Sequence, residues 1–151
     1  MGTNEVAVSR TIDATADTIY SIIADYETHH PHILPEAYFS GLEILEGGVG
    51  AGTRINVHAI VYGSQQTLHM GVAEPQPGRV LTETDLNGGM KTTFALQPVG
   101  DQQTVVTITT AWPPASGLQS LFNRLMLPRY VRRMLEAELE QLAAYVAVIN
   151  S

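Results

Sequence analysis

Three of the five histidines lie within four residues of one another, at His29, His30 and His32. Imidazole exchanges protons near neutral pH and is a common ligand of divalent metals. A metal site would require the three rings to converge, whereas Pro31 and Pro35 limit the segment to a turn or so of helix. We therefore interpret it as a partly exposed loop, with a position at the rim of a cavity as the alternative, and we predict no metal site.

His58 and His69 lie in two neighbouring segments that are predicted to be strands. A hairpin turn at Gly63-Ser64 would place the two rings directly opposite each other on one face of a sheet. On an inner face they could hydrogen-bond a ligand or move protons, but alternation with apolar neighbours favours the outer face for His58. Arg54 could bind a ligand carboxylate or phosphate if it pointed inward, and the alternation favours solvent exposure for it too.

Glu83 and Asp85 alternate along a predicted strand at residues 80–86, on the same face as Leu81. An inward carboxyl group would be removed from water and its pKa raised, which suits a general acid or base. An acidic outer face is the more ordinary arrangement for two carboxylates in one strand, and it is the interpretation that we favour.

A set of soft and aromatic side chains in the second half of the chain could line an adaptable apolar pocket. The same residues could serve as ordinary core packing, and one side chain can do both. As candidate ligand-binding residues we take Phe94, Trp112, Phe122, Met126, Tyr130 and Met134.

The elements that would position these side chains follow a simple order. Residues 6–12 alternate as a strand, and residues 15–26 carry an amphipathic helical stripe. From residue 38 to residue 112, six segments alternate apolar and polar residues between glycine and proline turns, as antiparallel hairpins do. The chain from Ser116 onward is predicted to be helical, with an apolar stripe formed by Val131, Leu135, Leu139, Leu142, Val146 and Ile149.

A long sheet must bury its apolar face, and the C-terminal helix is the only element large enough to cover it. We therefore predict an α+β fold, in which a seven-stranded curved antiparallel sheet wraps round the C-terminal helix and two short helices follow the first strand. Pro128 should kink or break the long helix near Arg124–Leu127. The apolar part before the break should lie over the mouth of a cavity between sheet and helix.

Composition limits the classes of function. The chain has 151 residues, of which 44% are hydrophobic, and we predict one ligand-binding domain spanning residues 1–151. A net charge of −7 argues against nucleic acid or an anionic membrane surface as a partner. The chain has no cysteine, which excludes disulfides and thiol chemistry, and no apolar run suits a membrane span or a secretory signal. We expect a cytoplasmic protein that needs no cofactor.

Several segments resemble the START-like (SRPBCC) superfamily, specifically its polyketide cyclase/dehydrase and lipid-transport branch. The matching pieces are IDATADTIY (12–20), IADY (23–26), GAGTR (50–54), EP and PGRVL (74–75 and 77–81), FALQPVGD (94–101) and TVVT (104–107). The resemblance implies a helix-grip fold over essentially the whole chain. Members of the superfamily include aromatase/cyclases, hormone-binding proteins, lipid carriers and quinone-binding chaperones, and they share no universal set of catalytic residues that could be carried over.

Three functions are therefore open. The leading hypothesis is the binding of a small hydrophobic or aromatic molecule in an internal cavity between the sheet and the C-terminal helix. The first alternative is a cyclase or dehydratase that acts on a polyketide-like substrate in the same cavity. The second alternative is a partner-binding or chaperone module that uses an exposed apolar surface. The oligomeric state is left open.

Overall fold

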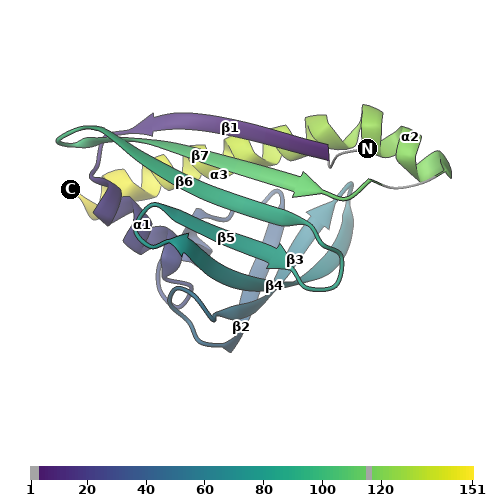
Figure 1. The fold of residues 1–151 in the computed structure, drawn as a ribbon, viewed down its shortest axis with the longest axis horizontal. Coiled ribbons are helices and arrows are strands. Elements are labelled where there is room, and N and C mark those ends of the chain that lie inside the picture. Colours follow the sequence, from purple (N-terminus) through teal and green to yellow (C-terminus); the bar gives the residue numbers. More distant parts are fainter. Residues whose placement is uncertain (1–3, 115–116) are drawn as a thin grey trace.

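The fold consists of one antiparallel sheet that curves over a long C-terminal helix (Figure 1). The computed structural model describes residues 4–114 and 117–151, without the side chains of residues 119, 120, 122 and 123. In chain order the elements are β1 (Asn4–Ile12), α1 (Ala16–Ala24), the 3₁₀ helix η1 (His30–Ile33), β2 (Phe39–Glu46), β3 (Arg54–Val61), β4 (Ser64–Gln76), β5 (Val80–Asp85), β6 (Lys91–Gly100), β7 (Gln103–Trp112), α2 (Gly117–Leu125) and α3 (Leu127–Ile149).

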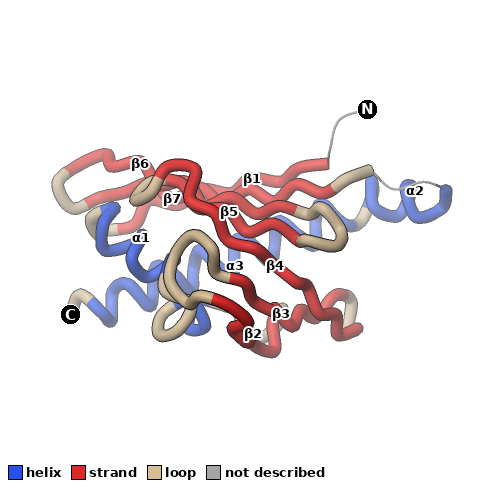
Figure 2. The backbone as a smooth tube through the Cα atoms, turned by 60° about the horizontal axis from the view of Figure 1, so that its bottom comes forward, coloured by secondary structure: helices blue, strands red, loops and turns tan. Residues whose placement is uncertain are grey.

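The sheet has seven strands in the order β1-β7-β6-β5-β4-β3-β2, and every neighbouring pair is antiparallel. Strands β2 to β7 form a meander, and β1 joins it by pairing with β7. Helix α3 packs against β1, β7 and η1, whereas α1 packs against β6, so the helices lie on one face of the sheet (Figure 2). The predicted seven-stranded sheet, the long helix and the two short helices after the first strand are confirmed.

Alternation in the last two strands determines which side chains reach the core. The inner face of β7 carries Val106, Ile108, Thr110 and Trp112, all of which are buried, and the intervening residues are more exposed. The apolar stripe of α3 is buried against this face, except for Ile149 in the last helical turn, which is 45% exposed. The alternating residues of the strand and the helical stripe of α3 thus pack against each other in one core.

The hairpin between β3 and β4 differs from the prediction by one step of register. The turn is formed by Tyr62 and Gly63, whose φ angles of 50° and 80° are both positive, as a two-residue type I′ turn requires. His58 consequently pairs with Thr67, and His69 lies one diagonal step away instead of directly opposite. The predicted turn at residues 63–64 is therefore wrong, although both histidines stay on one face.

The C-terminal helix is interrupted where Pro128 was expected to break it. Helix α2 ends at Leu125 and α3 begins at Leu127, so Pro128 falls in the first turn of α3. Backbone N–H groups in the first turn form no hydrogen bond within the helix, so a proline there breaks none. Ser116, the predicted start of the helix, lies outside the described residues.

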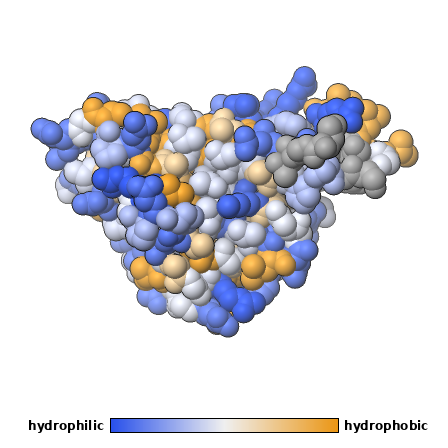
Figure 3. Space-filling model, viewed as in Figure 1, coloured by the Kyte–Doolittle hydropathy of each residue, from blue (hydrophilic) through white to orange (hydrophobic). Residues whose placement is uncertain are grey.

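The described side chains of helix α2 do not cover the cavity, contrary to the prediction, although Leu127, at the start of α3, does line it. Helix α2 projects beyond the sheet (Figure 1), and hydrophobic side chains gather on the surface at that end of the molecule (Figure 3). Leu118, Leu121 and Leu125 are between 52% and 87% exposed, and none of them lines the cavity. No helix in the described part of the chain is long and apolar enough to span a membrane.

Candidate ligand-binding site

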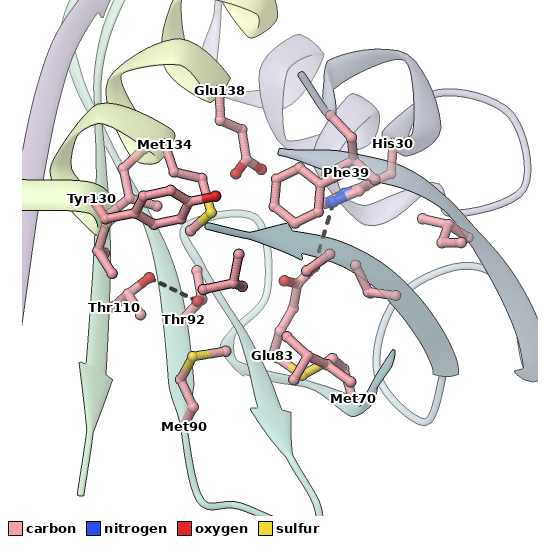
Figure 4. Close-up of a pocket in the computed structure, with 18 of the residues that line it drawn as sticks. His30, Phe39, Met70, Glu83, Met90, Thr92, Thr110, Tyr130, Met134 and Glu138 are labelled. Carbon is pink, nitrogen blue, oxygen red and sulfur yellow. Dashed lines mark hydrogen bonds and ion pairs between the residues drawn. The ribbon is translucent and has the colours of Figure 1, made fainter. Parts of the chain in front are cut away.

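A cavity of about 120 Å³ lies between α3 and the inner faces of strands β2 to β7. Most of its wall consists of aliphatic and thioether side chains. Apart from Tyr130, its polar side chains are His30, Glu83, Thr92, Thr110 and Glu138 (Figure 4). Within the described chain, no lysine or arginine lines the cavity. The site is therefore an apolar space onto which two carboxyl groups open.

Glu138 projects from the buried face of α3 and is only 4% exposed. Its carboxyl group forms no hydrogen bond or ion pair with any other residue that the structure describes. Burial raises the pKa of Glu138 well above its ordinary value, and the nearby charge of Glu83 raises it further. Glu138 thus remains a neutral carboxylic acid, able to donate a proton, over a pH range in which an exposed glutamate is ionised.

Glu83 enters the cavity from β5 and is 9% exposed. The hydroxyl of Tyr26 donates a hydrogen bond of 2.5 Å to Oε2 of Glu83, and Nε2 of His30 lies 3.5 Å from the same oxygen. The prediction that Glu83 points to solvent is wrong. Glu83 shares a face with Leu81, as expected, but that face is the inner one. The carboxyl group can lie there because the segment after α1 supplies two polar partners, Tyr26 and His30.

Tyr26 is positioned by the helix that precedes it. The side chain of Thr15 accepts a hydrogen bond from the backbone N–H of Thr18 at 3.2 Å and so caps α1. The buried stripe of α1, which includes Ile19 and Ile23, then seats the helix so that Tyr26 is only 1% exposed. Burial raises the pKa of Tyr26 well above its ordinary value, with the charge of Glu83 adding to the effect, so its hydroxyl stays a donor.

His30 is a buried part of the cavity wall, at 2% exposure, and the prediction of a partly exposed loop is wrong for this residue. Its Nδ1 lies 2.6 Å from the carbonyl oxygen of Ile23. A carbonyl can only accept, so Nδ1 carries the proton and donates it, which turns Nε2 toward Glu83. The ring stacks on Tyr26 at 4.3 Å and meets the edge of Phe94 at 6.0 Å.

The other two histidines of this segment lie apart from the cavity. Nδ1 of His29 is 2.7 Å from the hydroxyl of Tyr145, and the exposed ring of His32 stacks on the ring of Tyr145 at 5.3 Å. The three imidazoles therefore have different partners. Among the described residues there is no group of three or more side chains that could hold a metal ion.

The remaining polar groups of the cavity wall have partners. The hydroxyls of Thr92 and Thr110 form a hydrogen bond of 2.8 Å across β6 and β7. Tyr130 donates its hydroxyl proton to the backbone carbonyl of Ile60. Glu138 therefore differs from its neighbours, because it is deeply buried and has no hydrogen-bond partner among the residues that the structure describes.

The six candidate ligand-binding residues lie in different places. Tyr130 and Met134 line the cavity. Phe94 packs behind the ring of His30, and Trp112 is buried in the core beyond the cavity wall. Met126 lies between the two helices and is 46% exposed, because the break before Pro128 turns it away from the sheet. The side chain of Phe122 lies outside the described residues.

The polar residues of β3 and β4 are on the outer face, as predicted. Arg54 is 3.2 Å from Nε2 of His69 and 3.5 Å from the carboxylate of Glu46. His58 lies 3.6 Å from the carboxylate of Glu43. None of them lines the cavity.

The sequence prediction missed Glu138, although the sequence carries a signal for it. Glu138 falls three residues after Leu135 and four before Leu142, within the apolar stripe of α3. A carboxyl group at a position that the helical period assigns to the core indicates either a buried partner or a function.

Residues 3–147 match the sequence profile of the family described as polyketide cyclase / dehydrase and lipid transport. The chain belongs to this family. The match extends over nearly the whole chain, and so it includes every element that surrounds the cavity. A comparison with curated protein sequences finds no match.

Several proteins of known structure are similar to this chain. The KanY protein, solved in solution by NMR, is 27% identical, with a TM-score of 0.83 over 97% of this chain and 99% of that one. A START superfamily protein from Mycobacterium smegmatis is 17% identical, with a TM-score of 0.74 over 98% and 99% of the two chains. The Zhui aromatase/cyclase from a Streptomyces species is 24% identical, with a TM-score of 0.65 over 95% and 88%. At these low identities, the similarity to the last two proteins shows a shared fold only.

Proposed function

We propose that this protein binds a small hydrophobic or aromatic molecule in the cavity between the sheet and α3. The observation that carries the proposal is the cavity itself, which combines an apolar wall with a few converging polar groups. An engineered apolar cavity of about 150 Å³ is known to take up a benzene ring. The volume of about 120 Å³ is comparable, and so the best ligand is of the size of one ring.

Family membership supports this proposal, because the family description includes lipid transport as well as cyclase and dehydrase activity. Both require an apolar molecule to be held away from water. The fold supports it as well, since one helix cannot fill the whole concave face of a seven-stranded sheet.

The experiment that tests the proposal fills the cavity. Ala59 lines it from β3, and Ala144 is exposed on α3, so Ala59→Leu and Ala144→Leu make the same chemical change inside and outside the site. Binding of fluorobenzene is followed by ¹⁹F NMR, with thermal melts to verify that both variants fold. We expect Ala59→Leu to weaken binding at least tenfold and Ala144→Leu to leave it unchanged. Equal affinities in the two folded variants would place the ligand elsewhere.

A second candidate function, the dehydration of a β-hydroxy ketone, is favoured by the two carboxyl groups. Glu83 would accept the proton from the carbon between the carbonyl and the hydroxyl-bearing carbon, and the electron pair would form a carbon–carbon double bond. The hydroxyl group would leave as water with the proton of Glu138. Glu83 would then return a proton to Glu138 before the next turnover.

Incubation with 3-hydroxycyclohexanone, a β-hydroxy ketone of the size of one ring, tests this candidate through the ultraviolet absorbance of the conjugated enone. We expect Glu138→Gln to abolish enone formation and Glu140→Gln, an exposed change on the same helix, to leave it unaffected. If the ketone binds and no enone forms, the dehydratase is ruled out and the binding function stands.

A further inference from the structure

We propose that the molecule bound in the cavity is an apolar amine, whose ammonium group is held between the carboxyl groups of Glu138 and Glu83. The inference rests on the proposed binding function and deepens it by naming the class of ligand. It predicts that the cavity discriminates among molecules of one shape by their charge.

The first argument is the imbalance of charged groups around the cavity. Two carboxyl groups open onto it, and no described lysine or arginine does so. The one basic group among the described residues of the wall is His30. Its Nδ1–H donates to a backbone carbonyl and its Nε2 faces Glu83, so it makes no hydrogen bond or ion pair with Glu138. A neutral apolar ligand needs no such pair of acids, and a carboxylate ligand would be repelled by them.

The second argument is the isolation of Glu138. It is more than nine-tenths buried, faces the cavity and has no hydrogen-bond partner among the described residues. Burying a carboxyl group without a partner is unfavourable. A bound cation would supply the missing partner through a charge-assisted hydrogen bond and so offset this cost. An ammonium group carries up to three donors, enough to serve Glu138 and the oxygens of Glu83 together.

The third argument is the aromatic lining on the same side. Phe39 from β2 and Tyr130 from α3 line the part of the cavity into which Glu138 projects (Figure 4). Aromatic faces attract cations that have lost part of their water, and they also pack against an apolar body. The same wall thus suits both ends of an apolar amine.

Binding of an amine has a proton signature. Glu138 shares the cavity with Glu83 from β5 and with His30, and its charge is felt by the buried hydroxyl of Tyr26. An alkylamine is already protonated at pH 7, as a lysine side chain is. Its binding therefore ionises Glu138 and releases up to one proton to the buffer, whereas an alcohol of the same shape releases none.

The test compares benzylamine, benzyl alcohol and benzoate by calorimetry at pH 7, in two buffers that differ in ionisation enthalpy. We expect benzylamine to bind at least tenfold more tightly than benzyl alcohol, with release of a proton, and benzoate not to bind. Because proton release is measured on the unaltered protein, it does not depend on whether a variant folds. If benzyl alcohol binds as tightly as benzylamine, or if benzylamine binds without proton release, the amine proposal fails.

Two matched variants complete the test. Glu138→Gln should reduce the affinity for benzylamine at least tenfold and change that for benzyl alcohol less than threefold, whereas Glu140→Gln, which is exposed on the same helix, should change neither. Equal losses for both probes in Glu138→Gln would mean that Glu138 shapes the cavity without recognising charge. If the alcohol binds and the amine is not preferred, only the amine proposal falls; if no single-ring probe binds, the binding function falls with it.

Discussion

Replacing Glu138 by glutamine should stabilise the protein at alkaline pH and leave its stability nearly unchanged in acid. The folded chain holds this carboxyl group 4% exposed and without a partner in the described part of the chain, and burial raises its pKa well above the ordinary value of 4.5. Glutamine has almost the same shape and cannot ionise. The substitution therefore removes the cost of holding the carboxyl group protonated at alkaline pH, while it keeps the packing of α3.

The sign follows from the protons bound by each state. Between the ordinary pKa of glutamate and the raised pKa of Glu138, the folded chain holds a proton that the unfolded chain has lost. Stability therefore falls as pH rises through this window, and it is unaffected by Glu138 below the window. Raising a pKa by one unit corresponds to about 1.4 kcal/mol between the two protonation states. We expect Glu138→Gln to gain at least roughly that amount at pH 8 relative to pH 4, or several degrees in Tm for a chain of this size.

Urea unfolding of both proteins at pH 4 and pH 8 measures this effect as a double difference, which cancels the titration of all other groups. Glu140→Gln, on the solvated side of the same helix, should show a double difference near zero. If Glu138→Gln and Glu140→Gln behave alike, Glu138 is ionised and solvated in the folded protein, and both the neutral acid and the amine site are refuted.

Two further predictions concern the packing that surrounds the cavity. Leu139→Ala, at a position that is 2% exposed, should destabilise the fold by about 2–5 kcal/mol in urea unfolding, and Glu140→Ala by about 0.5 kcal/mol or less; similar losses would mean that α3 presents a different face to the sheet. Tyr26→Phe removes the donor to a buried oxygen of Glu83 and should cost about 1–3 kcal/mol, whereas Tyr145→Phe, at a half-buried hydroxyl, should cost about 1 kcal/mol or less. The Tyr26 contact is refuted as a stabilising bond if the two tyrosine variants unfold at the same urea concentration.

The sequence by itself determined the order and type of the elements, because these follow from patterns that repeat over a few residues. Alternation between residues 38 and 112 predicted the meander, and the 3.6-residue stripe of α3 predicted which helix face meets it. Pro128 predicted the break between α2 and α3, since the lost hydrogen bond and the ring clash are local effects. The acid at position 138 was also visible, as a polar interruption of the stripe.

Tertiary structure alone decided how the site is assembled. Alternation placed Glu83 on the face of Leu81 but could not say that this face is the inner one, because the partner of Glu83, Tyr26, is 57 residues away in the chain. The register of β3 and β4 depended in the same way on one turn, in which Tyr62 adopts a positive φ that its residue type does not suggest. Local patterns record the periodicity of a strand or helix, whereas the direction of a buried carboxyl group depends on contacts that form only when distant segments pack together.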